Sequence, residues 1–417
     1  MPENEKSIYI IGAGISGLIA AIVLERHGFS PKIIEAYGSV GGRVKTAVKD
    51  NYLLDHGFQV LLEAYPKAKE YLDYEALELQ KFVPGASIFY KGKKVTLGDA
   101  SRNLSLAWPT LTAGVGSFTD KWKVLKLALR LRNKSVEAIF EEEERTTLAY
   151  LQKEGFSQEM IDLFFKPFFT GIFLETKLET SSRMFEFVFK MFGEGAAVIP
   201  KKGIGAIPEQ LLGRLSNTKM RYRAKVKAIE NKKIVLTTGE ELDFEAVIIA
   251  TDANGLLKDH KIPKVNWKNC DNFYFRTDNP VLEKPIIGLV ADEQALINNL
   301  YYPSVFSGQK NGNIKNSMLS VTVVKDHNLS PEELESRVIK DLKEYCGISV
   351  SSSIAHFPIR KALPDLKDIK YSVTPQQTYL MDGIFQAGDQ ILNGSLNAAM
   401  IAGERAAQGV VDYLKKS

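Results

Sequence analysis

Short runs of apolar residues mark the buried strands that this chain is expected to form. Residues 7–11 make up the first run, and residues 18–27, which follow a glycine-rich turn, predict a helix that ends at Gly28. A second run, residues 32–35, finishes on the carboxylate of Glu35. Such continuous runs are typical of buried parallel strands. The order strand, helix, strand therefore predicts an α/β domain at the N-terminus.

The turn after the first strand carries the pattern Gly-x-Gly-x-x-Gly. Gly12 allows a sharp turn, Gly14 lets backbone N–H groups approach a pyrophosphate, and Gly17 lets helix and strand pack closely. The N-terminus of the helix would face the phosphates with unpaired donors and partial positive charge. Glu35 can accept hydrogen bonds from the hydroxyl groups of an adenosine ribose. The pattern predicts a dinucleotide site, and a glycine-rich turn without a ligand is the alternative.

The residues after Glu35 favour a dinucleotide without a 2′-phosphate. Ala36 and Tyr37 supply no adjacent cation for such a phosphate, which disfavours NADP. In the segment 41–43, two glycines allow close backbone approach, and the Arg43 guanidinium can pair with phosphate oxygens.

These residues together carry a resemblance to a known family. Residues 8–43 resemble the FAD fingerprint of the flavin-containing amine oxidase superfamily, which also includes phytoene desaturases and protoporphyrinogen oxidases. The resemblance implies FAD as the cofactor and a doubly wound FAD-binding domain with an inserted α+β substrate domain. A second dinucleotide loop is absent, because the turn at 203–208 lacks the third glycine. Reductases that pass hydride from NAD(P)H to FAD within one chain are therefore disfavoured.

A second motif of the same superfamily lies near the C-terminus. Gly388-Asp389 resembles the pair whose carboxylate binds the ribityl hydroxyl groups of FAD. Ser395 then caps a helix whose N-terminus, at Leu396-Asn397, meets the flavin pyrimidine edge in the superfamily. Reduction places negative charge near flavin N1, and a helix N-terminus stabilises that charge. A terminal helix docked on a sheet is the alternative.

Residues 55–60 resemble the stretch of the superfamily that runs beneath the flavin ring. Gly57 would let the backbone lie close to a planar ring, and a strand-to-helix turn with a buried Phe58 is the alternative. His56 is a candidate ligand or base, although a lone His is more often an ordinary hydrogen-bonded side chain.

The resemblance implies a set of cofactor-binding residues and no metal ligands. Val226 matches the position whose backbone meets the adenine, and Ala250-Thr251 ends a strand near the cofactor. FAD is expected to be bound without a covalent link, because no cysteine lies near Asp389. No catalytic residue is assigned, since the lysine that many amine oxidases hold near flavin N5 has no clear position. The implied cofactor-binding residues are Gly12, Gly14, Ile15, Ser16, Gly17, Glu35, Ala36, Gly42, Arg43, Gly57, Phe58, Gln59, Val226, Ala250, Thr251, Gly388, Asp389, Ser395, Leu396 and Asn397.

The chain is expected to divide into two domains, each built from separate segments. The FAD-binding domain would comprise residues 1–65, 198–255 and 366–417, and the substrate-binding domain would comprise residues 66–197 and 256–365. The first insertion loses the strand–helix rhythm and is expected to be mostly helical. Strand-like runs in the second insertion predict a broad mixed sheet.

Three local patterns bear on the substrate and the surface. The segment 156–192 holds 10 of the 22 Phe, so we expect some to line an apolar substrate tunnel, with a packed helical core as the alternative. Residues 118–134 predict an amphipathic helix that covers a domain, with a membrane-surface helix as the alternative. Residues 221–229 alternate strictly and predict one half-buried strand with a basic face.

Composition restricts the remaining classes of partner and compartment. The net charge of +4 is too small a bias to indicate nucleic acid binding. Cys270 and Cys346 lie far apart, which excludes a CxxC redox pair and a Cys-rich zinc site. The polar N-terminus lacks the apolar core of a signal peptide, and no apolar run approaches the roughly 20 residues of a spanning helix. We expect a cytoplasmic location, with peripheral membrane contact as the alternative.

Three functions remain open from the sequence. The first is an FAD-dependent dehydrogenase or desaturase that moves hydride from a carbon of a small, apolar, isoprenoid-like or porphyrin-like substrate to flavin N5. The second is an amine oxidase. The third is a non-enzymatic carrier like the GDP-dissociation inhibitors, which Glu35, Arg43 and Asp389 argue against because the carrier needs no flavin. The sequence assigns no electron acceptor.

Overall fold

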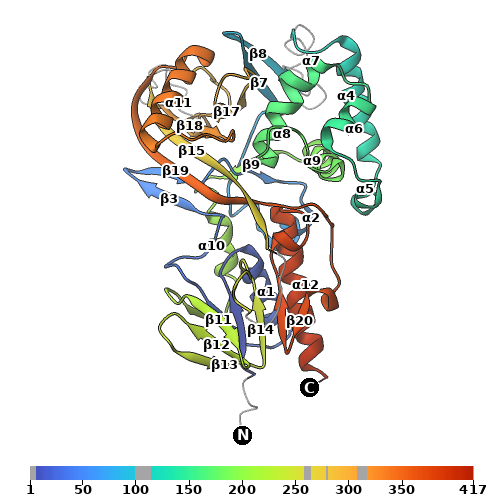
Figure 1. Ribbon diagram of the computed structural model, residues 1–417, viewed down its shortest axis with the longest axis vertical. Helices are drawn as coiled ribbons and strands as arrows, with labels where there is room; N and C mark the ends of the chain where they lie inside the picture. The colour runs from blue at the N-terminus through green and yellow to red at the C-terminus, as the bar shows by residue number, and fades with distance from the viewer. Residues whose placement is uncertain (1–5, 99–113, 258–263, 279, 308–316, 417) are drawn as a thin grey trace.

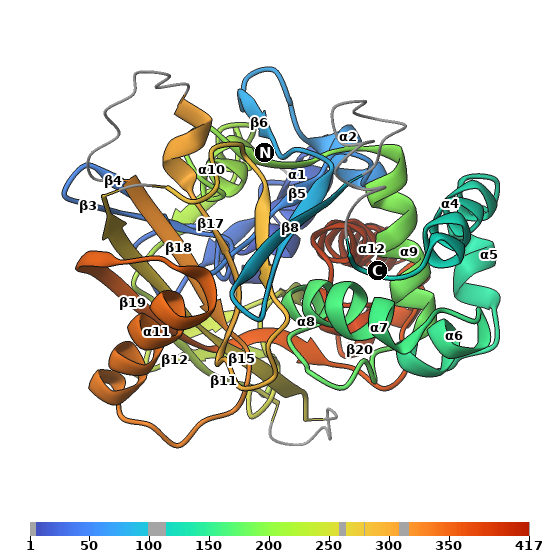
Figure 2. The ribbon, with the colours of Figure 1, turned by 90° about the horizontal axis from the view of Figure 1, so that it is seen from above.

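The computed structural model describes residues 6–98, 114–257, 264–278, 280–307 and 317–416. Two lobes are visible in Figure 1. The lower lobe holds a parallel sheet with its helices, and the upper lobe holds a mixed sheet beside a group of helices. Seen from above, the helices α4 to α9 lie on one side of the upper lobe and the mixed sheet on the other (Figure 2).

The lower lobe is organised around a six-stranded sheet in the order β10-β2-β1-β14-β21-β20. Its five consecutive strands from β10 to β21 pair in parallel, and β20 adds an antiparallel edge. The strands are β1 (Ile8–Ile11), β2 (Lys32–Ile34), β10 (Lys219–Arg221), β14 (Ala246–Ile249), β20 (Tyr379–Met381) and β21 (Ile384–Gln386).

The two faces of the central strand β1 enter different cores, as the alternation of a strand requires. Ile8 and Ile10 pack with the helices α1 (Ile15–Arg26) and α12 (Leu396–Leu414). Tyr9 and Ile11 pack instead against an antiparallel sheet of β11 (Val226–Glu230), β12 (Lys233–Leu236) and β13 (Glu241–Asp243). The lobe therefore has three layers, and its α/β, doubly wound character agrees with the predicted fold class.

The single strand predicted over residues 221–229 is wrong. The chain leaves the parallel sheet after β10, passes through Arg223 at φ +53°, and starts β11 in a separate sheet. The backbone N–H of Ala224 donates to the carbonyl of Glu35 at 2.9 Å, which holds this bend against the end of β2.

The upper lobe contains a seven-stranded sheet in the order β19-β15-β18-β17-β16-β7-β8. The predicted broad mixed sheet is present, because β16 pairs in parallel with β7 while the other pairs are antiparallel. The strands are β7 (Gly85–Tyr90), β8 (Lys93–Gly98), β15 (Asn266–Thr277), β16 (Ile287–Val290), β17 (Ile297–Tyr301), β18 (Ser317–Val323) and β19 (Val350–Asp365). The helix α11 (Pro331–Cys346) packs on one face.

Residues 79–98 are an exception to the expectation that the first insertion is mostly helical. They form three strands, and β7 reaches the mixed sheet only by pairing with β16, 201 positions later in the chain. Because the partner strand is so far away in the chain, no pattern within residues 79–98 predicts this pairing. The remaining strands are β3 (Thr46–Lys49), β4 (Tyr52–Asp55), β5 (Leu61–Leu62), β6 (Leu79–Lys81) and β9 (Ala197–Pro200).

Helices occupy most of the described residues between 118 and 194. A π-helical turn at Ile161–Phe165 leads into a helix with Pro167 in its first turn. None of the helices in the described ranges combines the length and apolar character needed to cross a membrane. The helices not yet named are α2 (Pro66–Tyr71), α4 (Phe118–Arg132), α5 (Val136–Glu141), α6 (Thr147–Lys153), α7 (Gln158–Met160), α8 (Lys166–Phe173), α9 (Ser182–Glu194) and α10 (Ala206–Leu212).

The segments that build the parallel sheet come from both ends and the middle of the chain. β1 and β2 lie near the N-terminus, β10 and β14 lie in the middle, and β20 and β21 lie near the C-terminus. The domain limits given above remain a prediction.

Close packing of α12 on α1 yields a first test. A Cβ atom at Gly403 would fall well inside van der Waals contact with the backbone carbonyl oxygen of Ser16. We expect Gly403→Ala to lower the free energy of unfolding by about 1–3 kcal/mol, as overpacking does in tight cores. Urea unfolding of the two proteins measures the difference.

The matched control is Gly193→Ala in α9, where an added Cβ meets nothing within 4 Å. Alanine is favoured over glycine inside a helix by up to about 1 kcal/mol, so this variant should be at least as stable as the parent. Equal stabilities of the two variants would contradict the packing argument.

Candidate functional site

A cavity of about 2510 Å³ lies where the two lobes meet. Pockets for single small molecules usually measure about 300–1000 Å³, so this one has room for a dinucleotide and a second molecule. Its lining includes the loop after β1, the loop after β2, the segment after β21, the long strands β15 and β19, and the Phe-rich helices.

The glycine turn opens α1 toward the cavity. Gly12 has φ +104°, which favours glycine, and an added Cβ at Gly17 would clash with the carbonyl of Gly12. Gly14 caps the helix without a side-chain hydrogen bond, and a Cβ there would meet nothing within 4 Å. The first turn contains no acidic residue. Free N–H donors beside open space suit an anionic group such as a pyrophosphate.

Glu35 lies at the next corner of the cavity and is 6% exposed. Its Oε2 accepts the N–H of Ala13 at 2.8 Å, and its Oε1 accepts the N–H of Tyr37 at 2.9 Å. A carboxylate has about four acceptor sites, so two remain for a ribose. Glu35 therefore holds the glycine turn in place, and the ribose contact at its two remaining acceptor sites stays a prediction.

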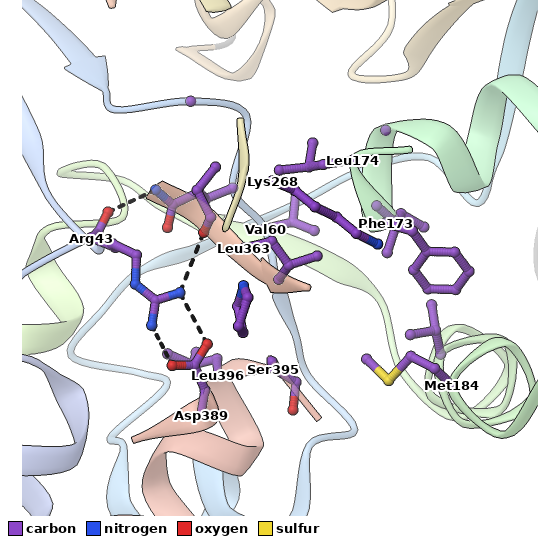
Figure 3. Close-up of a pocket in the computed structure, with 18 of the residues that line it drawn as sticks. Arg43, Val60, Phe173, Leu174, Met184, Lys268, Leu363, Asp389, Ser395 and Leu396 are labelled. Carbon is purple, nitrogen blue, oxygen red and sulfur yellow. Dashed lines mark hydrogen bonds and ion pairs between the residues drawn. The ribbon is translucent and has the colours of Figure 1, made fainter. Parts of the chain in front are cut away.

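An ion pair joins the N-terminal and C-terminal motifs (Figure 3). Arg43 Nη1 donates to Asp389 Oδ2 at 3.0 Å, and Nη2 pairs with Oδ1, so the contact is bidentate. The guanidinium also donates to the carbonyl of Ala362 at 3.3 Å and lies 5.1 Å from the ring centre of Trp267. Two residues predicted to bind different parts of FAD thus stand side by side.

The C-terminal motif has the predicted backbone, with one difference at its end. Gly388 has φ +132°, and the Ser395 hydroxyl accepts the N–H of Ala398 at 3.0 Å as the cap of α12. Asn397, by contrast, turns its side chain toward α2, where Oδ1 accepts the N–H of Lys67 at 3.0 Å. Asn397 and Gly17 do not line the cavity, whereas the other residues predicted to bind the cofactor do.

The segment 56–60 runs along the cavity wall. Gln59 Nε2 donates to the carbonyls of Arg43 at 2.9 Å and His56 at 2.8 Å, which fixes this segment to the loop after β2. Burial, aided by the charge of Lys45, lowers the pKa of His56 to about 4. The imidazole is therefore neutral at physiological pH and adds no positive charge to the site.

Tyr301 does not face the cavity. It lies in the core behind Phe58, with ring centres 4.9 Å apart. It therefore supports the wall rather than contacting a bound molecule.

The far part of the cavity is apolar. Five of the ten Phe residues between 156 and 192 line it, together with Met184 and Leu174, which Figure 3 shows beside Phe173. The other five are buried in the helical core, so the segment contributes to both the cavity wall and the packed core, and the substrate tunnel stays a prediction. The five Phe residues of the lining are Phe164, Phe168, Phe173, Phe189 and Phe192.

Lys268 on β15 is the residue that sequence reasoning missed. Its side chain reaches into the cavity between the Arg43–Asp389 pair and the apolar part (Figure 3). Nζ lies 3.3 Å from Thr180 Oγ1 and 3.7 Å from Asp365 Oδ1. The sequence carries no signal that distinguishes Lys268 from the other lysines. Only the course of β15, which brings this strand into the cavity, identifies it.

Cys270 also lines the cavity, although it is far from Asp389 in sequence. Burial, followed by the charge of Asp271, raises the pKa of the Cys270 thiol to about 12. The sulfur therefore stays protonated and is a poor nucleophile for covalent attachment of a flavin.

Comparison with known proteins identifies similar sequences and folds. The family model for flavin containing amine oxidoreductases matches residues 15–411. A protoporphyrinogen oxidase from Arabidopsis thaliana is 28% identical over 170 residues, covering 40% of this chain and 32% of that protein. An L-amino-acid oxidase from Bothrops moojeni is 31% identical over 155 residues, covering 36% of this chain and 29% of that protein. The matched region thus spans about a third of each curated relative.

Solved structures share the fold over the whole chain. A protein described as a protoporphyrinogen oxidase from Exiguobacterium superimposes with a TM-score of 0.71 at 18% identity, over 99% of both chains. Putrescine oxidase bound to putrescine gives a TM-score of 0.71 at 16% identity, over 99% of this chain and 100% of that one. At these identities the likeness concerns the fold alone.

Glu35→Ala tests the corner between the glycine turn and the ribose position. FAD affinity should fall about ten- to hundredfold, because a hydrogen bond to a charged acceptor is lost. The free energy of unfolding of the apoprotein should fall by about 1–3 kcal/mol, since the buried N–H of Ala13 loses its partner. Glu35→Gln keeps one acceptor oxygen, so its FAD affinity and its free energy of unfolding should lie between those of the parent and of Glu35→Ala. Unchanged FAD affinity in the alanine variant would refute the predicted contact.

Asp389→Ala tests the opposite end of the same cofactor. Loss of the carboxylate should weaken FAD retention and make the flavin midpoint potential more negative, because α12 no longer meets a fixed ring. Spectroelectrochemical titration of the FAD-loaded proteins measures the potential. The control is Glu35→Ala, whose bound FAD should keep the parental potential since the adenosine end lies far from N1. Equal shifts in both variants, or none in either, would show that Asp389 does not act at the flavin end.

Proposed function

This chain belongs to the flavin-containing amine oxidoreductase family, and we propose that it dehydrogenates a lipophilic substrate. Membership makes it an FAD-dependent oxidoreductase, so the carrier function considered from the sequence is set aside. The proposed substrate is isoprenoid-like or porphyrin-like. A hydride, which carries both electrons, would leave a substrate carbon for flavin N5, while a proton leaves the neighbouring atom. FAD, when bound, supplies the hydride acceptor.

The observation that carries this proposal is the apolar part of the cavity. Phe164, Phe168 and Phe192 form a continuous set of ring contacts, with Phe168 centred 5.6 Å from Phe164 and 5.3 Å from Phe192. All three rings are partly buried and line the cavity. An apolar substrate that binds against this wall is stabilised by about 25 cal/mol for each Å² of apolar surface removed from water. A polar substrate would gain little from the same contact.

The chain itself would bind and orient the two reactants. The donors at the N-terminus of α1 and the Arg43 guanidinium would hold the phosphates, and Asp389 would hold the ribityl chain. The N-terminus of α12 would face the flavin pyrimidine edge and stabilise charge that develops there. The apolar wall would exclude water and turn the reacting carbon toward the ring.

Lys268 favours amine oxidation as the second candidate. Many amine oxidases hold a lysine near flavin N5, and Lys268 reaches into this cavity from β15. The similarity of part of the chain to L-amino-acid oxidases supports the same candidate. A cationic lysine beside the substrate would disfavour a charged ammonium group, so this reaction would require the neutral amine.

Anaerobic reduction of the FAD-loaded protein distinguishes the two candidates. We expect a polyene or a porphyrinogen to bleach the flavin absorbance, and amines or amino acids to leave it unchanged. Phe168→Asp should slow bleaching by the apolar substrate at least about tenfold, since a charge replaces a buried ring edge. The matched comparison is Lys268→Met, which should leave bleaching by the polyene or porphyrinogen unchanged. If amines bleached the flavin of the parent, slower amine bleaching in Lys268→Met would support the second candidate. Bleaching by amines alone would refute the lipophilic substrate.

A further inference from the structure

The helix α4 carries a row of large apolar side chains on its outer surface. Phe118, Trp122, Leu125 and Leu129 are 74%, 58%, 50% and 54% exposed. Their spacing of four, three and four positions places them on one face of the helix. We call these four residues the α4 apolar row. They account for four of the ten large apolar residues that are exposed in the described part of the chain.

No residue in the described part of the chain buries this face. The opposite face buries Leu127 and Leu131, which are 2% and 0% exposed, against the helical core that includes α9. The outward row is therefore a second apolar face of the same helix. A helix at the surface of a soluble domain normally carries polar residues there. Figures 1 and 2 both draw α4 at the outer edge of the helical group.

The charges around the row are positive. α4 has five basic residues and a single acid, Asp120, which is 1% exposed and forms the capping box with Ser117. Arg130, whose side chain is 45% exposed, donates to Glu154 at 3.1 Å. Lys126 Nζ lies 6.0 Å from the ring centre of Trp122, at one border of the row, and Arg132 lies at the other border by helical position. The rim of the row thus suits an anionic surface.

The row continues into the cavity. Phe118, Trp122 and Leu125 belong to the cavity lining as well as to the outer surface. Because these three side chains are exposed, they border an entrance to the cavity that Phe164, Phe168 and the Arg43–Asp389 pair also line. A partner that covers the row also covers this entrance.

We propose that the α4 apolar row docks the protein on an anionic membrane surface and opens the cavity to lipid. Helices that lie at the headgroup boundary of a membrane typically carry Trp, Phe and Leu on one face and Lys or Arg at the borders of that face. Docking in this way would let a lipophilic substrate enter from the bilayer, and that last step rests on the proposed function. A second copy of the chain and an acidic protein are the alternative occupants.

Co-sedimentation of the full-length, FAD-loaded protein with vesicles tests the docking without any substrate. The protein should bind vesicles of phosphatidylcholine mixed with phosphatidylglycerol and bind vesicles of phosphatidylcholine alone more weakly. Leu129→Asp should reduce binding to the mixed vesicles at least about tenfold, because a charge replaces an inserted side chain. Lys126→Glu combined with Arg132→Glu should reduce it by a similar factor, at about fivefold for each cation removed. None of these three residues lines the cavity.

The matched control is Val48→Asp on β3, an apolar residue 72% exposed and away from α4. It should bind the mixed vesicles like the parent, and retained flavin absorbance reports that every variant is folded. Absence of binding to the mixed vesicles, or equal binding by parent and Leu129→Asp, would overturn the proposal. A dimer in solution that Leu129→Asp dissociates, without vesicle binding, would assign the row to a second copy. These results are independent of which substrate bleaches the flavin.

Discussion

The contact between α1 and α12 positions the parts of the site that lie furthest apart in sequence. Only glycine at 403 lets α12 approach the carbonyl of Ser16 as closely as it does, and Gly17 gives α1 the same freedom against the turn at Gly12. α1 then fixes the loop after β1, to which the loop after β2 is joined by the N–H of Gly41 donating to the carbonyl of Ala13 at 2.8 Å, and α12 fixes the segment after β21. Arg43 and Asp389 meet as a result, although they are separated by 346 positions. A shift of either helix would move one end of the cofactor cradle against the other.

The parts of this arrangement that depend on neighbouring residues could be predicted from the sequence. The glycine turn, the strand-end position of Glu35 and the Ser395 cap each follow from a short segment, and the structure has each of them. The prediction that Asn397 binds the cofactor rests only on its position at the N-terminus of α12. Its side chain turns to α2 because Lys67 offers a backbone N–H there, which no local pattern reveals.

The parts that could not be predicted depend on distant pairing. β7 completes the upper sheet through β16, so residues 85–90 were read as part of a helical insertion. Lys268 becomes part of the site only because β15 extends from that sheet into the cavity. Arg223 breaks an apparently regular strand because the backbone around it bonds to the end of β2. The sequence of α4 predicts an amphipathic helix, but only the structure shows that nothing in the described residues covers its outward face.

The cavity has two ends of opposite chemistry, and this difference links the proposed substrate to the proposed membrane surface. Helix N-termini, Arg43 and Asp389 make one end polar, while phenylalanine rings make the other end apolar. Moving a lipophilic molecule through water costs about 0.8 kcal/mol for each exposed CH₂ group, so a long chain pays a large barrier on that route. An entrance bordered by Phe118, Trp122 and Leu125 would avoid most of that barrier if it faced a bilayer. For a small polar amine the same entrance would offer no advantage. The outward apolar row therefore fits a lipophilic substrate better than it fits the amine candidate that Lys268 favours.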